Sequence, residues 1–202
     1  MNANVTAVPG HPHSEAEAVH EQRELGFWLY LMGDAVLFAL LFMTYCVMVG
    51  NTAGGPSGKA LFSLNNAALE TALLLVSSTT FGFASLASRA GNRPAVLSWL
   101  LLTFVLGAGF IFLEIREFLG MIAAGAGPDR SGFLSAFFTL VGTHGTHVSV
   151  GLVWILIMSG QVFLKGLSLP VTSRLFRLGL FWHFLDIAWV GIFSVVYLPG
   201  LL

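Results

Sequence analysis

The sequence predicts an all-α membrane protein, a bundle of five transmembrane helices with its N-terminus in the cytoplasm and its C-terminus in the periplasm. Only 9% of the 202 residues are charged and 56% are hydrophobic, whereas roughly a quarter of the residues in soluble domains are charged. The apolar residues gather in five runs of about 18 or more, the length at which a helix crosses a bilayer. Backbone that faces lipid must satisfy its own hydrogen bonds, so each run is expected to be helical.

The first expected span covers residues 27–49 and follows a polar segment. Residues 1–25 are rich in Glu and His and lack the basic start and short apolar stretch of a cleavable signal. We interpret them as a mobile cytoplasmic tail. Residues 26–202 are then expected to form one transmembrane domain.

The second and third spans are expected at residues 65–87 and 94–115. A loop rich in Gly, Pro and Ser precedes the second span. Pro94 stands at the start of the third, where its missing N–H costs a helix nothing. Residues 116–130 are expected to form a loop.

The fourth and fifth spans are expected at residues 132–164 and 178–198. Asp129 or Ser131 would cap the fourth helix, which is longer than a bilayer requires and is therefore expected to tilt or protrude. Small residues recur in the spans and would let helices approach closely; they are Gly107, Gly109, Gly142, Gly145 and Gly151.

The orientation follows from the distribution of Lys and Arg, which favour the cytoplasmic side. With five spans, the N-terminal side holds six such residues, which are Arg23, Arg89, Arg93, Lys165, Arg174 and Arg177. The opposite side holds three, which are Lys59, Arg116 and Arg130. No dense basic cluster is present, so a nucleic-acid partner is not expected.

Ionisable residues inside the spans are the candidate functional residues, because each is costly in hydrocarbon and usually faces other helices. Asp34 lies about two turns into the first span. Glu70 and Glu114 both fall toward the outer face. They could interact there through water or a proton, or extend separately to the interface, and the residues alone leave both readings open.

Histidines mark the last two spans. His144 and His147, and likewise His183 and Asp186, are three residues apart, so each pair shares a helix face. By depth, Asp34, His147, His183 and Asp186 are expected to form a buried polar cluster that ties three helices together, because such groups demand partners in low dielectric.

A cofactor is the alternative reading of these histidines. His144 or His147 together with His183 could ligate a haem, and two His with a carboxylate could hold a metal. Hydrogen-bonded packing explains them without a cofactor. Five tryptophans are expected to anchor the chain at the membrane interfaces, with Trp182 and Trp189 on the polar fifth span as possible exceptions.

Two motifs carry a resemblance to a known family. Residues 137–148 contain Gly-Thr-His-Gly-Thr-His-Val, and residues 181–189 read Phe-Trp-His-Phe-Leu-Asp-Ile-Ala-Trp. In this order and spacing they resemble subunit III of haem–copper respiratory oxidases. Residues 26–34 are similar to the family helix that bears a buried carboxylate, which places Asp34 at that position, although Gly33 stands where many members have a hydroxyl residue.

Other segments favour the cytochrome o ubiquinol oxidase branch of this family. Residues 50–56 and 127–134 are similar to that branch, and cytochrome c oxidase subunits commonly have seven spans rather than five. Within residues 109–118, Glu117 matches the acid seen across the wider family, and Glu114 resembles a quinol-oxidase feature.

The resemblance implies an accessory role in a multi-pass complex of the bacterial inner membrane. Such a complex oxidises ubiquinol, reduces dioxygen to water and pumps protons, so it is an oxidoreductase, although this chain would hold no catalytic residue, cofactor or metal. Haems and copper are expected in subunit I, the main partner, with subunits II and IV also present. The chain would stabilise subunit I and hold phospholipid, with structural roles near the lipid cleft for Asp34, Glu70, Glu114, His144, His147, His183 and Asp186.

Three other functions remain as alternatives. The chain could be a haem-binding membrane anchor of a quinone reductase, or subunit III of a cytochrome c oxidase. A proton-coupled transporter using Asp34, Glu70 and Glu114 is a further alternative, although such transporters often contain inverted repeats and more spans.

Overall fold

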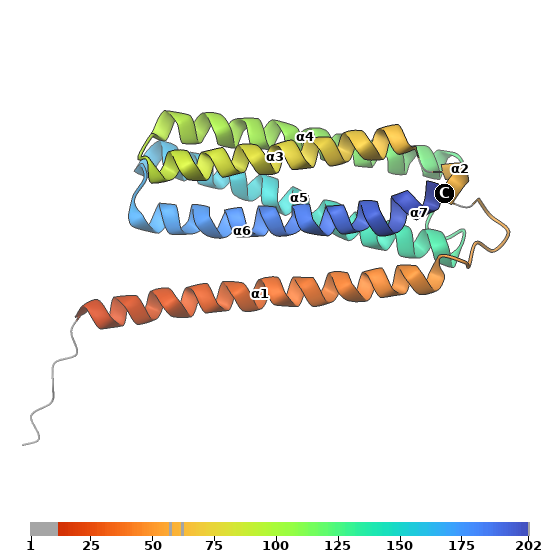
Figure 1. Cartoon of the computed structure of the whole chain (residues 1–202), viewed down its shortest axis with the longest axis horizontal. Coiled ribbons are helices and arrows are strands. Elements are labelled where there is room, and N and C mark those ends of the chain that lie inside the picture. The colour runs from red at the N-terminus through yellow and green to blue at the C-terminus, as the bar shows by residue number, and fades with distance from the viewer. Residues whose placement is uncertain (1–11, 57, 62, 202) are drawn as a thin grey trace, which may run out of the picture. The chain divides into compact units, whose positions relative to one another are not determined.

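Helices make up most of the computed structural model, which describes residues 12–56, 58–61 and 63–201 (Figure 1). Within these residues, five helices are long and apolar enough to cross a membrane, as the sequence predicts. In chain order the elements are α1 (Pro12–Met48), α2 (Gly58–Leu61), α3 (Leu64–Arg89), α4 (Arg93–Ala123), α5 (Gly132–Lys165), α6 (Leu169–Ile192), the π-helical turn η1 (Phe193–Tyr197) and α7 (Leu198–Leu201).

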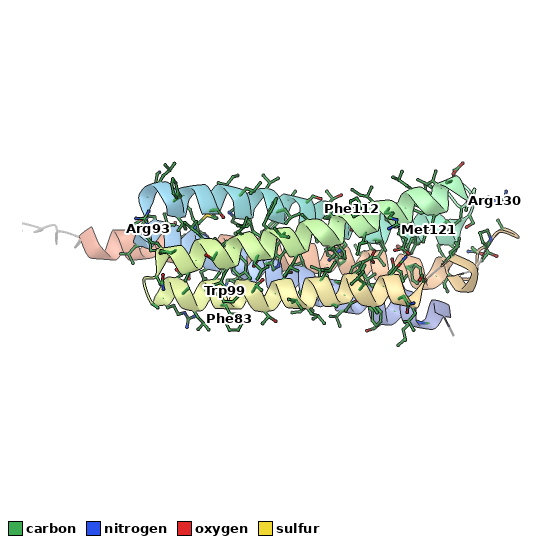
Figure 2. All side chains as sticks on the ribbon, turned by 90° about the horizontal axis from the view of Figure 1, so that it is seen from above. Phe83, Arg93, Trp99, Phe112, Met121 and Arg130 are labelled. Carbon is green, nitrogen blue, oxygen red and sulfur yellow. The ribbon has the colours of Figure 1, made fainter. Side chains whose placement is uncertain are left out.

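The chain divides into two compact units, Met1–Val36 and Leu37–Leu202. In the second unit, α3 packs on α4, α4 on α5, α5 on α6, and α6 returns to α3, so these four helices close into a bundle (Figure 1). The loops after α3 and α5 lie at one end of this bundle. Figure 2 shows Arg93 at that end and Arg130 at the other.

Helix α1 begins well before the first apolar run. It starts at Pro12, so much of the segment expected as a tail is helical and continuous with the span. Residues 1–11 of that tail lie outside the described residues. The polar start of α1 carries no apolar periodicity, which is why the sequence pattern did not reveal it.

Helix α4 continues to Ala123, so the expected loop at residues 116–130 is wrong for its first half. Apolar side chains continue past Glu117, and Met121 is buried, which stabilises two further turns. The helix ends before Gly125, whose φ of 74° suits a residue without Cβ. Helix α6 also starts earlier than expected, at Leu169, because Pro170 stands in its first turn and Val171 is buried against the bundle.

Side-chain caps fix the starts of α4 and α5. The Ser131 hydroxyl accepts a hydrogen bond from the Leu134 backbone N–H at 3.2 Å, which identifies Ser131 rather than Asp129 as the cap of α5. Asn92 caps α4, because its Oδ1 accepts a hydrogen bond from the Ala95 backbone N–H at 3.2 Å. Pro94 lies inside the first turn, as expected.

Glycines create the space for one large aromatic side chain at the centre of the bundle. A Cβ at Gly107 of α4 or Gly151 of α5 would lie 2.9 Å from ring atoms of Trp182, which is fully buried. These two glycines therefore admit the indole of α6 between α4 and α5. The prediction that small residues allow close approach is confirmed here.

Candidate functional site

His144 links α5 to α6 in the interior of the bundle. Its side chain is fully buried, and its Nε2 lies 3.1 Å from the backbone oxygen of Leu185. The ring stacks at a tilt on Trp189, with centroids 5.1 Å apart, and meets the Phe110 ring edge-on at 5.7 Å. An imidazole so enclosed by protein serves as a packed helix–helix contact.

Three acidic side chains lie near one another at the end of the bundle that holds η1. Glu70 of α3 is 1% exposed and Glu114 of α4 is 4% exposed, and both interact electrostatically with Glu117 and with each other. Both are therefore buried, so the alternative in which they extend to the interface does not describe them. We call Glu70, Glu114 and Glu117 the acid cluster.

The acid cluster is held by contacts that the sequence did not reveal. The carboxyl of Glu114 lies against the backbone of Gly145, where a Cβ would stand 2.5 Å from Oε1. The Tyr197 hydroxyl donates a hydrogen bond to Glu117 Oε2 at 3.2 Å. Tyr197 is fully buried in the π-helical turn, and nothing in its spacing marks it as a partner of an acid on α4.

His183 and Asp186 turn toward α3. Ser78 Oγ lies 2.7 Å from His183 Nδ1 and also hydrogen-bonds to Asp186. We expected His183 and Asp186 to cluster with His147 and Asp34, and that grouping stays a prediction. The structure adds Ser78 of α3 as a partner of both side chains. A serine hydroxyl can accept a hydrogen bond from one of these groups and donate one to the other.

His147 and Asp34 have local contacts in the structure. His147 Nδ1 lies 2.8 Å from the backbone oxygen of Thr143, one turn earlier in α5, and its ring packs against Phe38 with centroids 5.4 Å apart. In the unit Met1–Val36, the Tyr30 side chain hydrogen-bonds to Asp34 one turn along α1.

Two tryptophans on α6 are interior donors rather than interface anchors. The indole N–H of Trp182 donates to Ser77 Oγ at 3.2 Å, and that of Trp189 donates to Thr71 Oγ1 at 3.0 Å. Both rings are buried, so the exception that the sequence allowed for them is confirmed. Hydroxyl residues of α3 thus hydrogen-bond to four polar side chains of α6, which are Trp182, Trp189, His183 and Asp186.

The same histidines were the candidates for a haem or metal. His144 directs Nε2 to a backbone oxygen, and His183 directs Nδ1 to Ser78. Over the described part of the chain, no group of three or more His, Cys, Asp or Glu has the arrangement of a metal site. Their geometry is that of interhelical hydrogen bonds.

Five membrane-spanning helices joined by buried hydrogen bonds define a multi-pass membrane protein whose polar residues hold helices together. The cytochrome c oxidase subunit III family model matches residues 6–201. The chain belongs to this family.

Several relatives from bacteria match nearly the whole chain. Cytochrome bo(3) ubiquinol oxidase subunit 3 of Pseudomonas aeruginosa is 53% identical over 96% of this chain and 92% of its own length. The protein of the same name in Pseudomonas putida is 56% identical over 88% of this chain and 86% of its own length. Cytochrome c oxidase subunit 3 of Bacillus sp. (strain PS3) is 42% identical over 96% of this chain and 93% of its own length.

Proposed function

We propose that the chain is the accessory third subunit of a ubiquinol oxidase of the cytochrome bo(3) type. The observation that carries this proposal is the 53% identity to the Pseudomonas aeruginosa subunit across nearly the full length of both chains. The buried polar groups support a structural role, because His144 Nε2 and His183 Nδ1 each lie within hydrogen-bond distance of an oxygen atom on another helix. The oxidation of ubiquinol, the reduction of dioxygen and the pumping of protons would then take place in the partner subunits.

In this proposal the chain carries no redox cofactor. Haems and copper belong to subunit I, which is the main partner, and subunits II and IV complete the complex. The complex would lie in the bacterial inner membrane, and this chain would stabilise subunit I and retain phospholipid. Asp34, the acid cluster and the histidines would serve as polar links between helices.

The proposed orientation places the N-terminus in the cytoplasm. The end of the bundle with Arg93 collects most of the loop Lys and Arg, and the end with Arg130 has fewer (Figure 2). The positive-inside rule assigns the richer end to the cytoplasm. A cysteine-labelling experiment at residues 53 and 91 with a membrane-impermeant reagent tests this, and labelling of residue 91 from the periplasm would contradict it.

A pull-down tests the function. A tagged chain is purified in mild detergent, and the eluate is analysed by visible spectroscopy and oxygen consumption. We expect a haem-bearing partner in the eluate, and oxygen consumption with a ubiquinol donor but not with reduced cytochrome c. A chain that purifies without haem protein would contradict the proposal. Activity with reduced cytochrome c but not with ubiquinol would show that the chain belongs to a cytochrome c oxidase instead.

A further inference from the structure

A groove runs along the outer side of the contact between α3 and α6. It has a volume of about 600 Å³, and its lining includes Ser78, Thr79, Gly82, Phe83, His183 and Asp186. We call it the α3–α6 groove. Its lining includes neither a member of the acid cluster nor His144.

The ionisable residues of this groove lie near the middle of a membrane-spanning helix. His183 is 14 residues from each end of the span Leu169–Tyr197, which is about 21 Å at 1.5 Å per residue. Its side chain is exposed in the chain alone, and Asp186 is half-buried. An imidazole and a carboxyl at this depth are costly when they face lipid tails.

Internal contacts satisfy these groups only in part. His183 uses Nδ1 in its bond to Ser78, and among the described residues Nε2 has no hydrogen-bond partner. Asp186 Oδ1 also has none. A lipid head group cannot reach them, because it stays at the interface, and an acyl chain offers no hydrogen bond.

The surface between these groups suits another helix. Ser78 and Gly82 are four residues apart on one face of α3, the spacing of small residues at which membrane helices approach closely. A Cβ added at Gly82 would meet nothing within 4 Å, so the space above it is open. Phe83, which packs on Trp99 with ring centroids 5.0 Å apart, borders it on the side of α4 (Figure 2).

We propose that the α3–α6 groove receives a transmembrane helix of another subunit of the oxidase, whose polar side chain hydrogen-bonds to His183 or Asp186. This inference rests on the proposed function and adds to it the face of the chain that meets a partner. Helix α1 does not fill the groove with its second half, because Phe38 packs on Phe184 and Phe42 lies over Gly191. Phe184 and Gly191 lie on a different face of α6 from His183 and Asp186.

Photo-crosslinking in the intact complex tests the proposal. A benzophenone amino acid is placed at Thr79 or Phe83 in the groove, and at Val105 or Ile157 on exposed faces of α4 and α5 as controls. We expect the groove positions to crosslink to another subunit and the control positions to do so less. Products with lipid only, with a second copy of this chain or with its own N-terminal segment would overturn the proposal.

A second pair of variants tests the same surface without removing a polar group. Gly82→Leu fills the groove, whereas Gly160→Leu adds the same side chain at another open position on α5. We expect Gly82→Leu to lower the amount of haem-bearing partner recovered with the chain about tenfold, as overpacking of a helix contact does. Gly160→Leu should leave it unchanged.

The outcomes separate this inference from the proposed function. If the wild-type chain brings down no haem protein, the proposed function itself fails. If the wild-type complex is intact but Gly82→Leu assembles as well as Gly160→Leu, the function stands and the groove is not the interface. Membrane levels of each variant chain, measured by immunoblot, distinguish loss of assembly from loss of the chain.

Discussion

At the scale of single residues, hydroxyl groups of α3 provide most of the partners for polar groups of α6. Ser77 accepts from Trp182, Thr71 accepts from Trp189, and Ser78 bonds to His183. Small hydroxyl side chains let the two helices stay close while satisfying donors that lipid cannot satisfy. This explains how a span with His, Asp and two Trp can remain inside a membrane.

The bond between Ser78 and His183 can be tested by substitution. Ser78→Ala should lower the unfolding free energy by about 0.6 kcal/mol, the typical value for hydrogen bonds between membrane helices. Thr79→Ala is the control, because its hydroxyl bonds to Leu75 in its own helix. Denaturant titration of the purified complex measures both, and equal losses in the two variants would contradict the account.

Close packing of the Trp182 ring predicts a larger effect. Gly151→Ala would place a Cβ 2.9 Å from that ring, which should destabilise the protein by about 1–3 kcal/mol through overpacking. Gly160→Ala, on the same helix but in open space, should be neutral or slightly stabilising. Thermal melting in detergent compares them, and equal melting temperatures would show that the ring has room.

Which polar residues matter could be predicted from the sequence, but not all of their partners. Glu70, Glu114, His144 and His183 stand out because ionisable groups are rare in apolar spans. Serine and threonine are common in such spans, so nothing distinguishes Ser78 from Thr79 before the helices are placed. Tyr197 was not identified either, because nothing in the sequence pairs it with Glu117, 80 residues away.

At the scale of elements, one arginine joins the ends of two helices. The Arg93 guanidinium at the start of α4 donates from Nη2 to the backbone oxygens of Val162 and Phe163, at 3.0 and 2.8 Å. These carbonyls belong to the last turn of α5, where a cation also offsets the helix dipole.

Removing this contact should loosen the end of α5. We expect Arg93→Ala to cost about 1 kcal/mol and to speed amide hydrogen exchange over residues 163–168. Arg89→Ala is the control, since Arg89 is exposed in the last turn of α3. Unchanged exchange in Arg93→Ala would mean that solvent supplies an equally good partner.

The number and order of the transmembrane helices follow from hydrophobicity, but several helix ends do not. Residues 116–123 extend α4 because Met121 is buried there. Arg116 and Glu117 lower the local hydropathy, so hydropathy alone does not predict this extension. The first turns of α6 are likewise fixed by packing of Val171 and Leu175, which depends on the neighbouring helices.

At the scale of the whole molecule, a substitution of Asp34 tests whether the acidic residues of the membrane-spanning helices have a structural role. Asp34→Asn should loosen the complex more than it slows electron transfer, because a neutral amide changes the hydrogen bonding of a group about two turns into the first apolar run. Blue-native gels report assembly, and oxygen consumption reports turnover. An intact complex without turnover would contradict a structural role.

We expect this chain to hold its helices and a partner subunit together and to bind no redox group. The most direct measurement is the haem content per copy of subunit I, from the visible spectrum of the oxidase purified with and without this chain. We expect the same haem content in both preparations and a less stable complex without the chain. Loss of haem that returns with the wild-type chain, but not with a His144→Gln, His183→Ala double variant, would contradict it.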